Sequence, residues 1–220
     1  MQAFKTEGII LKRRDFGEAD RILTVFSFHR GKITVLAKGV RRITSRRAGN
    51  VELLNRTQMF LHPGKQFLIL TEAVSLDTFQ KIKADLTLST HAYHIIELID
   101  RLTAENQESP ILYTNIVEVL KRLERNPRQI LIRAFEVKIL SLMGFTNFQE
   151  LTFEVRAHST SEVGELMKEL ESKSWDEIEM MEINKNQALE LEQGLRYHID
   201  RVLESSLKSR QFLKHATNNS

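Results

Sequence analysis

The chain has 220 residues, enough for one large domain or two small ones, and its 41% hydrophobic content with 3 Pro and 9 Gly predicts a folded protein. It contains no Cys, which excludes disulfides and thiolate-bound zinc and suits a reducing cytoplasm. No apolar run approaches the roughly 20 residues that span a bilayer, and the first residues lack the apolar core of a signal peptide. We therefore expect a cytoplasmic protein without a membrane partner.

The net charge of +3 hides an uneven distribution. Residues 1–80 hold 14 Lys and Arg against 7 Asp and Glu, whereas the remaining residues hold 18 against 22. The positive charge therefore belongs to the N-terminal third. Such a field is typical of a protein that binds a polyanion, with nucleic acid the commonest partner and an anionic membrane surface the competitor.

Residues 1–80 are predicted to form a small β-barrel. Their apolar segments are short, rich in β-branched and aromatic residues, and separated by turn signals. The predicted strands cover residues 4–13, 21–28, 32–37, 51–61 and 66–75. Gly31 and Pro63-Gly64 predict the hairpin turns after the second and fourth strands. Short antiparallel strands packed into so few residues fit a closed or nearly closed barrel, which removes exposed edges.

The apolar spacing becomes helical after the barrel segment. Helices are predicted over residues 84–102, from Ser109-Pro110, and from Asn126-Pro127 to Gly144, because Ser or Asn can cap a helix and Pro suits its first position. Two more are predicted over residues 161–170 and 187–207. The expected fold class is α+β, with a barrel domain over residues 1–80 and a helical domain over residues 81–220.

The connection between the third and fourth predicted strands reads KGVRRITSRRAGN, residues 38–50. It contains no acid and the cations Lys38, Arg41, Arg42, Arg46 and Arg47. Because close like charges repel unless a ligand or counterions neutralise them, the loop favours a polyanion. The excess of Arg favours phosphate, since a guanidinium can donate to two oxygens at once. The alternative is an ordinary solvated loop.

Other candidate residues give weaker signals. Phe16 lies in a polar stretch and is expected to be an exposed aromatic side chain, while most of the other Phe residues of the barrel are expected in the core. His91, His94 and Glu97 share one side of a helix, which indicates a polar face rather than a metal site, since no fourth ligand is evident. No catalytic motif is present, so neither an enzyme nor a cofactor is expected.

The segment EGIILKRRDFGEADRILTVFSFHRGKITVLAKGVRR, residues 7–42, resembles the N-terminal domain of the bacterial DNA repair protein RecO. ELIDRL at 97–102, LIRAFEVKILSLMGF at 131–145 and LKSRQFL at 207–213 resemble later motifs of the family, in the same order. The resemblance therefore covers both ends and the middle of the chain.

Membership of the RecO family implies an N-terminal OB-fold followed by a helical domain. It implies a recombination mediator, not an enzyme, that binds single- and double-stranded DNA and anneals complementary strands. With RecR, such a protein helps to load RecA onto DNA coated by single-stranded DNA-binding protein. The expected location is the cytoplasm, in association with the nucleoid.

The resemblance also implies roles for individual residues. Lys38, Arg41 and Arg42 match the basic loop of the family and are the first candidates for phosphate contacts. The further DNA-binding candidates, in the same loop or on the bordering strands, are Arg46, Arg47, Lys12, Arg13, Arg14 and Arg21. Arg133 is a candidate for holding the C-terminal tail of single-stranded DNA-binding protein, the alternative being an ordinary helix-surface Arg near Glu136.

One segment departs from the family. Many RecO proteins carry a four-Cys zinc module after the third helix, but residues 146–185 contain no Cys and are rich in Glu. We expect a reduced, metal-free replacement there. Two other classes of protein stay open, an RNA-binding OB-fold module and a scaffold whose basic face binds an acidic protein.

Overall fold

A computed structural model of the chain describes residues 2–145 and 161–217, with side chains to residue 203. The chain divides into two compact units, Met1–Pro127 and Arg128–Ser220. None of the helices in the described ranges is long and apolar enough to cross a membrane.

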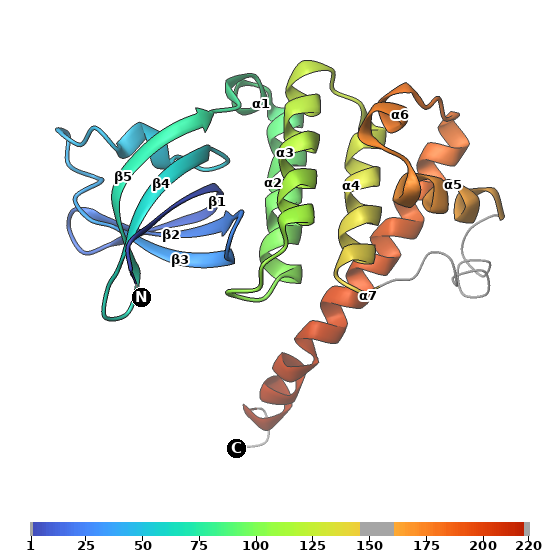
Figure 1. Ribbon diagram of the computed structural model, residues 1–220. Coiled ribbons are helices and arrows are strands. Elements are labelled where there is room, and N and C mark those ends of the chain that lie inside the picture. Colours follow the sequence, from blue (N-terminus) through green and yellow to red (C-terminus); the bar gives the residue numbers. More distant parts are fainter. Residues whose placement is uncertain (1, 146–160, 218–220) are drawn as a thin grey trace. The chain divides into compact units, whose positions relative to one another are not determined.

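The first unit begins with a closed five-stranded barrel (Figure 1). Its strands are β1 (Phe4–Phe16), β2 (Asp20–Ser27), β3 (Gly31–Ala37), β4 (Arg56–Pro63) and β5 (Leu68–Asp77). They follow one another around the barrel in the order β1-β2-β3-β5-β4, which confirms the predicted barrel. Alternate residues of β3, among them Ile33 and Val35, point into a core of Leu, Val and Ile side chains.

The strand pairs are antiparallel with one exception, because β3 and β5 are parallel where they meet, with Val35 opposite Leu68 and Leu36 opposite Ile69. The expectation of a wholly antiparallel barrel was therefore wrong. The physical reason is the long connection after β3, which carries the chain past the position of β5 before β4 begins. When β4 turns back into β5, that strand runs in the same direction as β3.

Several strand ends differ from prediction, since β1 continues to Phe16 and β5 covers Leu68–Asp77, and the largest difference is at β4. Residues Ala48–Val51 form a 3₁₀ turn, η1, so β4 begins at Arg56 rather than at residue 51. β4 also continues through Pro63, and the chain reverses just after it, where the Gly64 N–H donates to the Phe67 carbonyl at 3.0 Å. The turn before β3 is as predicted, with Gly31 at φ 59°, in the left-handed region.

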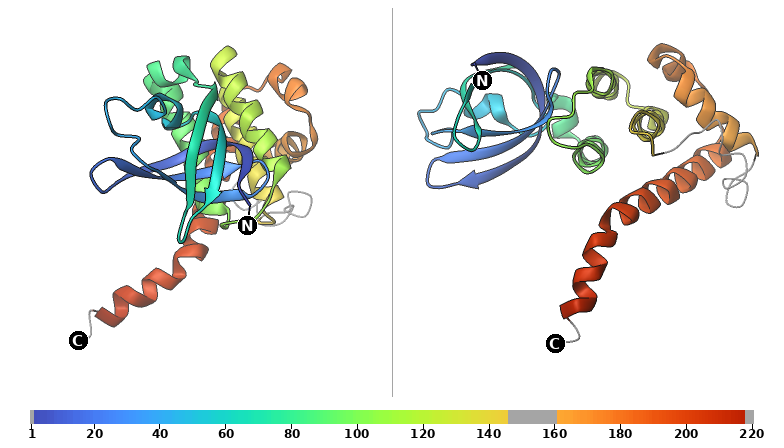
Figure 2. Two further views of the ribbon diagram at one scale, coloured as in Figure 1. Left: turned by 60° about the vertical axis from the view of Figure 1, so that its left-hand side comes forward. Right: turned by 60° about the horizontal axis from the view of Figure 1, so that its bottom comes forward.

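Three helices complete the first unit: α1 (Gln80–Ala84), α2 (Leu86–Leu102) and α3 (Pro110–Arg125). Asp85 ends α1 and caps α2, because its carboxylate accepts the Leu88 N–H at 2.9 Å. Pro110 occupies the first turn of α3 as predicted, although the Ser109 side chain makes no cap bond. α2 and α3 lie side by side next to the barrel (Figure 2).

Specific contacts join the barrel to these helices. The Phe28 and Tyr113 rings meet edge to face at 5.5 Å, and the Lys32 Nζ donates to the Asp100 carbonyl at 2.5 Å. The Asn106 N–H donates to the Lys32 carbonyl at 2.8 Å. These contacts lie inside one compact unit, and the predicted boundary between residues 80 and 81 stays a prediction.

The second unit contains four helices: α4 (Gln129–Leu142), α5 (Ser161–Ser172), α6 (Trp175–Met180) and α7 (Lys185–Thr217). α4 is buried on most of its surface and contacts the other three. It begins after Arg128, two residues beyond the predicted Asn126-Pro127 start, because Arg128 is extended and its guanidinium donates to the Met181 carbonyl at 2.7 Å. The left-handed stop predicted at Gly144 is confirmed by its φ of 71°.

The predicted replacement of the zinc module falls partly outside the described residues, since residues 146–160 are not among them. Its described part contains α5 and the unpredicted α6. The sequence signal for α6 is its capping box, in which Ser174 and Glu177 each accept the other's backbone N–H.

Candidate nucleic-acid interface

The candidate interface centres on the cation loop, residues 38–47, which follows β3. The start of the loop is hydrogen-bonded to the start of β2, where the Asp20 carboxylate accepts the Gly39 N–H at 2.7 Å. The Arg41 N–H donates to the Ala19 carbonyl at 2.9 Å beside it. Gly39 has φ 65°, a conformation that favours glycine.

Arg47 fastens the other end of the cation loop. Its guanidinium donates to the Leu70 carbonyl of β5 and to the Lys38 carbonyl, both at 2.8 Å, and to the Thr71 carbonyl at 3.3 Å. It therefore joins the two ends of the loop to each other and to the barrel. These bonds occupy donors that a phosphate would otherwise take, so the geometry gives Arg47 a structural role.

Three cations of the loop, Lys38, Arg42 and Arg46, are exposed. Within the described part of the chain their side chains make no hydrogen bond or ion pair. With Thr44 and Ser45 they line one open depression of about 470 Å³, whose lining also includes Arg47 and Asp20. Asp20 accepts the Gly39 N–H and makes no ion pair with these three side chains, so the depression keeps an excess of positive charge. Cations that converge without acidic partners on an ordered loop form a surface suited to an anion.

Three other predicted cations are already paired with acids. Arg41 and Arg21 share Asp15, at 3.3 Å and 3.1 Å, and Arg21 lies 3.5 Å from Glu52, which also pairs with Arg13. Three positive charges are thus balanced by two negative ones. Neither acid was among the predicted site residues. No local pattern indicates the pairing of Glu52, because Glu52 lies in the connection between β3 and β4 whereas Arg13 and Arg21 belong to β1 and β2.

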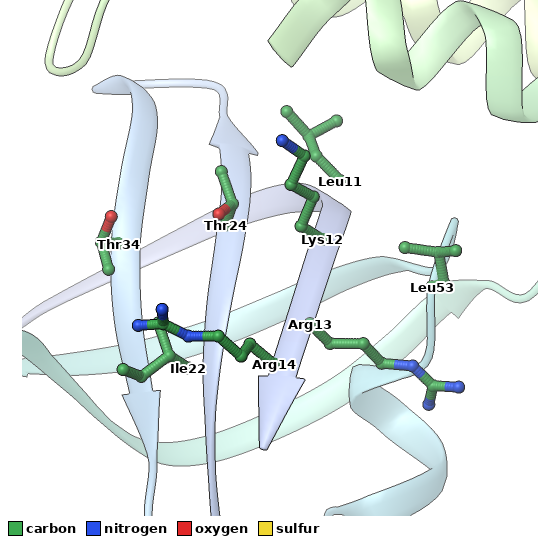
Figure 3. A pocket seen from close by; sticks show the side chains of 8 residues that line it. All are labelled: Leu11, Lys12, Arg13, Arg14, Ile22, Thr24, Thr34 and Leu53. Carbon is green, nitrogen blue, oxygen red and sulfur yellow. The ribbon is translucent and has the colours of Figure 1, made fainter. Parts of the chain in front are cut away.

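A second basic surface, which we call the strand groove, lies on the outer side of β1, β2 and β3. Figure 3 shows the side chains that line it, Leu11, Lys12, Arg13, Arg14, Ile22, Thr24, Thr34 and Leu53. Arg14 extends across Ile22 towards β3, while Arg13 points the opposite way (Figure 3). Lys12 pairs with Asp100 of α2, whereas the Arg14 side chain has no hydrogen bond or ion pair with any described residue.

Phe16 is exposed, as predicted, with a relative exposure of 45%. Its ring meets the Phe67 ring edge to face at 6.5 Å. Phe16 also adjoins Gly17, whose carbonyl accepts a bond from the Arg41 guanidinium at 3.3 Å. The aromatic pair therefore lies beside the anchored side of the cation loop. Phe26 is fully buried, as predicted for the core, whereas Phe28, Phe60 and Phe67 are only partly buried.

Two further predicted sites lie in the helices. Arg133 of α4 is 16% exposed and donates to the buried Glu136 at 2.8 Å, and it pairs with Glu192 at 3.2 Å. That Arg133 holds the C-terminal tail of single-stranded DNA-binding protein stays a prediction. To bind a tail, Arg133 would have to give up its bonds to Glu136 and Glu192. At His91, His94 and Glu97, as elsewhere in the described residues, no group of three His, Cys, Asp or Glu side chains is arranged to hold a metal ion.

One charged neighbour of the interface, Lys83, is half-buried. Burial lowers the pKa of Lys83, whose Nζ donates to the Asn55 side chain at the end of the connection between β3 and β4. Lys83 therefore helps to fix the path of that connection through its bond to Asn55.

Two family models match the chain. The model described as "Recombination protein O N terminal" matches residues 1–79, and the one described as "Recombination protein O C terminal" matches residues 83–147. Together they cover more than half of the chain. The closed barrel and the helices that follow it agree with the fold that the RecO resemblance implied.

Curated relatives give the same result. The DNA repair protein RecO of Acetivibrio thermocellus is 36% identical over 148 residues, which cover 66% of this chain and 59% of the relative. That of Desulforudis audaxviator is 35% identical over 145 residues, covering 66% and 58%. That of Desulforamulus reducens is 28% identical over 242 aligned positions, covering 97% and 94%. The match thus spans less than two thirds of the first two relatives and nearly all of the third.

Proposed function

Because the chain belongs to the RecO family of DNA repair proteins, we propose that it binds single- and double-stranded DNA through its cation loop and anneals complementary strands. The observation that carries this proposal is the group of three exposed cations, Lys38, Arg42 and Arg46, at one depression where they outnumber its acid Asp20 and form no ion pair with any described residue. The family relationship supplies the identity of the polyanion.

The order of the loop supports phosphate binding. Asp20 and Arg47 hold the loop backbone in place, so little conformational entropy is lost when a strand binds. Arg14 in the strand groove offers a further unpaired cation on the same barrel. Two polyanionic strands repel each other, and cations that screen both allow base pairing to begin.

The wider role follows from the family alone. We propose that, together with RecR, the protein helps to load RecA onto DNA coated by single-stranded DNA-binding protein. The reaction needs no nucleotide or metal in this proposal. The contacts with RecR and with the tail of single-stranded DNA-binding protein are not assigned to residues beyond the candidate Arg133.

The salt dependence of binding tests the proposed phosphate contacts. Affinity for a single-stranded oligonucleotide is measured across salt concentrations for wild type and for Lys38→Ala, Arg42→Ala and Arg46→Ala. Each substitution is expected to reduce the slope of log affinity against log salt by about 0.7, because one fewer counterion is released. Lys5→Ala is the matched control, since Lys5 is an exposed cation near the opposite end of β1. Slopes equal to wild type in all three variants would rule out the loop assignment.

The annealing step needs its own measurement. The rate at which complementary strands pair is followed for the same variants, and it is expected to fall in parallel with binding. A variant that binds poorly but anneals at the wild-type rate would contradict the mechanism. Repeating the titration with RNA of the same sequence tests the RNA-binding alternative, which predicts tighter binding to RNA.

A further inference from the structure

Ile43 lies in the middle of the cation loop and has a relative exposure of 105%, so its side chain touches almost nothing in the protein. Single exposed apolar side chains are common and do not by themselves mark a site. Ile43 differs from an ordinary exposed residue in its backbone position and in its charged surroundings.

The backbone presents Ile43 outward on a fixed support. The Ser45 N–H donates to the Arg42 carbonyl at 2.9 Å, which makes residues 42–45 a turn with Ile43 at its first corner. Turn corners usually carry Gly, Pro, Asn, Asp or Ser, so a β-branched apolar residue there is unusual. Branching at Cβ also restricts its rotamers, which makes the side chain a stiff apolar projection.

The charges around Ile43 indicate what it meets. Among the cations without a bond to any described residue, Arg42 precedes it and Arg46 follows it, and no acid occurs in residues 38–50. A nucleic acid drawn to these cations brings its phosphates to both sides of Ile43. The apolar surfaces of a nucleic acid are the faces of its bases, and these are accessible in an unpaired strand.

We propose that Ile43 is a wedge that packs against the faces of unpaired DNA bases and separates stacked neighbours, while the flanking cations hold the phosphates. The proposal rests on the proposed function, because it assumes that the loop binds DNA. Apolar side chains, Ile among them, separate base steps in other DNA-binding proteins. A contact with the face of a base leaves its pairing edge free, which suits a protein that brings two strands together.

Fluorescence of 2-aminopurine placed within a single-stranded oligonucleotide tests the wedge, because its emission rises when the base unstacks. Wild type is expected to raise the emission, and Ile43→Ser to lose most of that rise. At fixed salt, Ile43→Ser is expected to bind single strands about three- to tenfold more weakly, because the apolar contact is lost. Its salt slope stays at the wild-type value, since no charge changes.

Two further variants sharpen the result. Ile111→Ser is the matched control, because Ile111 is the same residue type, is 64% exposed, and lies in the first turn of α3, away from the loop. It is expected to behave as wild type in every measurement. Ile43→Phe keeps an apolar face and is expected to retain the emission rise.

The outcomes separate the wedge from the DNA-binding proposal. If Ile43→Ser keeps the wild-type emission rise and affinity, the wedge is overturned and the phosphate contacts are unaffected. The wedge is also overturned if Ile43→Ser loses as much affinity for duplex DNA as for single strands. Absence of any emission rise with wild type would overturn it too. The cation variants decide the proposed function independently, because their readout is the salt slope.

Discussion

At the scale of single residues, Arg46 and Arg47 are adjacent and of the same type, yet they have different surroundings. Arg46 is exposed beside the depression, whereas the Arg47 guanidinium donates to three backbone carbonyls. One side chain is available to a ligand and the other holds the loop.

Arg47→Lys separates these roles. The substitution keeps the charge, but a lysine ammonium lacks the planar arrangement of donors that reaches several carbonyls at once. We expect the variant to be destabilised by about 1 to 2 kcal/mol, measured by denaturant unfolding, with little change in its salt slope. Arg46→Ala is the control, expected to change stability by less than about 0.5 kcal/mol while lowering the slope. An Arg47→Lys variant as stable as wild type would show that the three bonds contribute nothing.

The sequence predicted the cations but could not predict their pairing. The basic loop was recognisable because its charges are consecutive and lack acids. Glu52 and Asp100, which pair with Arg13 and Lys12, lie far from them in the sequence and approach only when the barrel closes and α2 packs against it. Whether a cation is paired with an acid or left exposed therefore depends on tertiary contacts, which no local pattern encodes.

At the scale of elements, two glycines with the same φ angle lie in the turns of different hairpins. Gly17, after β1, and Gly31, the first residue of β3, both have φ 59°. A Cβ at Gly17 would meet nothing within 4 Å, whereas one at Gly31 would lie 1.8 Å from the Gln107 carbonyl oxygen. The second hairpin is thus packed against the segment before α3, and the first is open.

The two Gly→Ala variants are expected to differ for this reason. Gly17→Ala carries only the strain of a left-handed alanine, about 1 to 2 kcal/mol. Gly31→Ala adds a clash with backbone that cannot move easily, so we expect a loss of at least about 3 kcal/mol or failure to fold. Thermal unfolding of both variants checks this, and equal midpoints would contradict the packing of this hairpin.

Element types were predictable where the apolar period was long, as in α2 and in the alternating strand β3. The parallel contact of β3 with β5 was not predictable, because strand direction depends on the path of the connection rather than on any strand's own pattern. The short η1 and α6 were also missed. A single turn of helix contains too few residues for a period, and only the capping box of α6 gave a signal.

At the scale of the whole molecule, the compact unit Met1–Pro127 contains the barrel and α1 to α3, beyond the predicted boundary at residue 80. The contacts of Phe28 with Tyr113 and of Lys32 with Asp100 cross that boundary. Removing the helices would expose the apolar surface that α2 and α3 cover.

Fragments that end at the two boundaries test which one separates folding units. We expect residues 1–127 to unfold in one cooperative transition, and residues 1–80 to be poorly folded, because their covering helices are absent. Circular dichroism during heating distinguishes the two. A fragment of residues 1–80 that unfolds cooperatively at the same temperature as residues 1–127 would support the earlier boundary.

The parallel contact between β3 and β5 also affects the order in which the chain folds. Its paired residues lie far apart in the sequence, so bringing them together costs loop-closure entropy and belongs to the late stages of folding. The cation loop is anchored on one side by Asp20, at the start of β2, and on the other by carbonyls of β5. The loop therefore takes its final shape only once β3 and β5 have paired. A partly folded chain carries the same charges without this arrangement, and any ligand that binds only the finished loop stabilises the closed barrel by mass action.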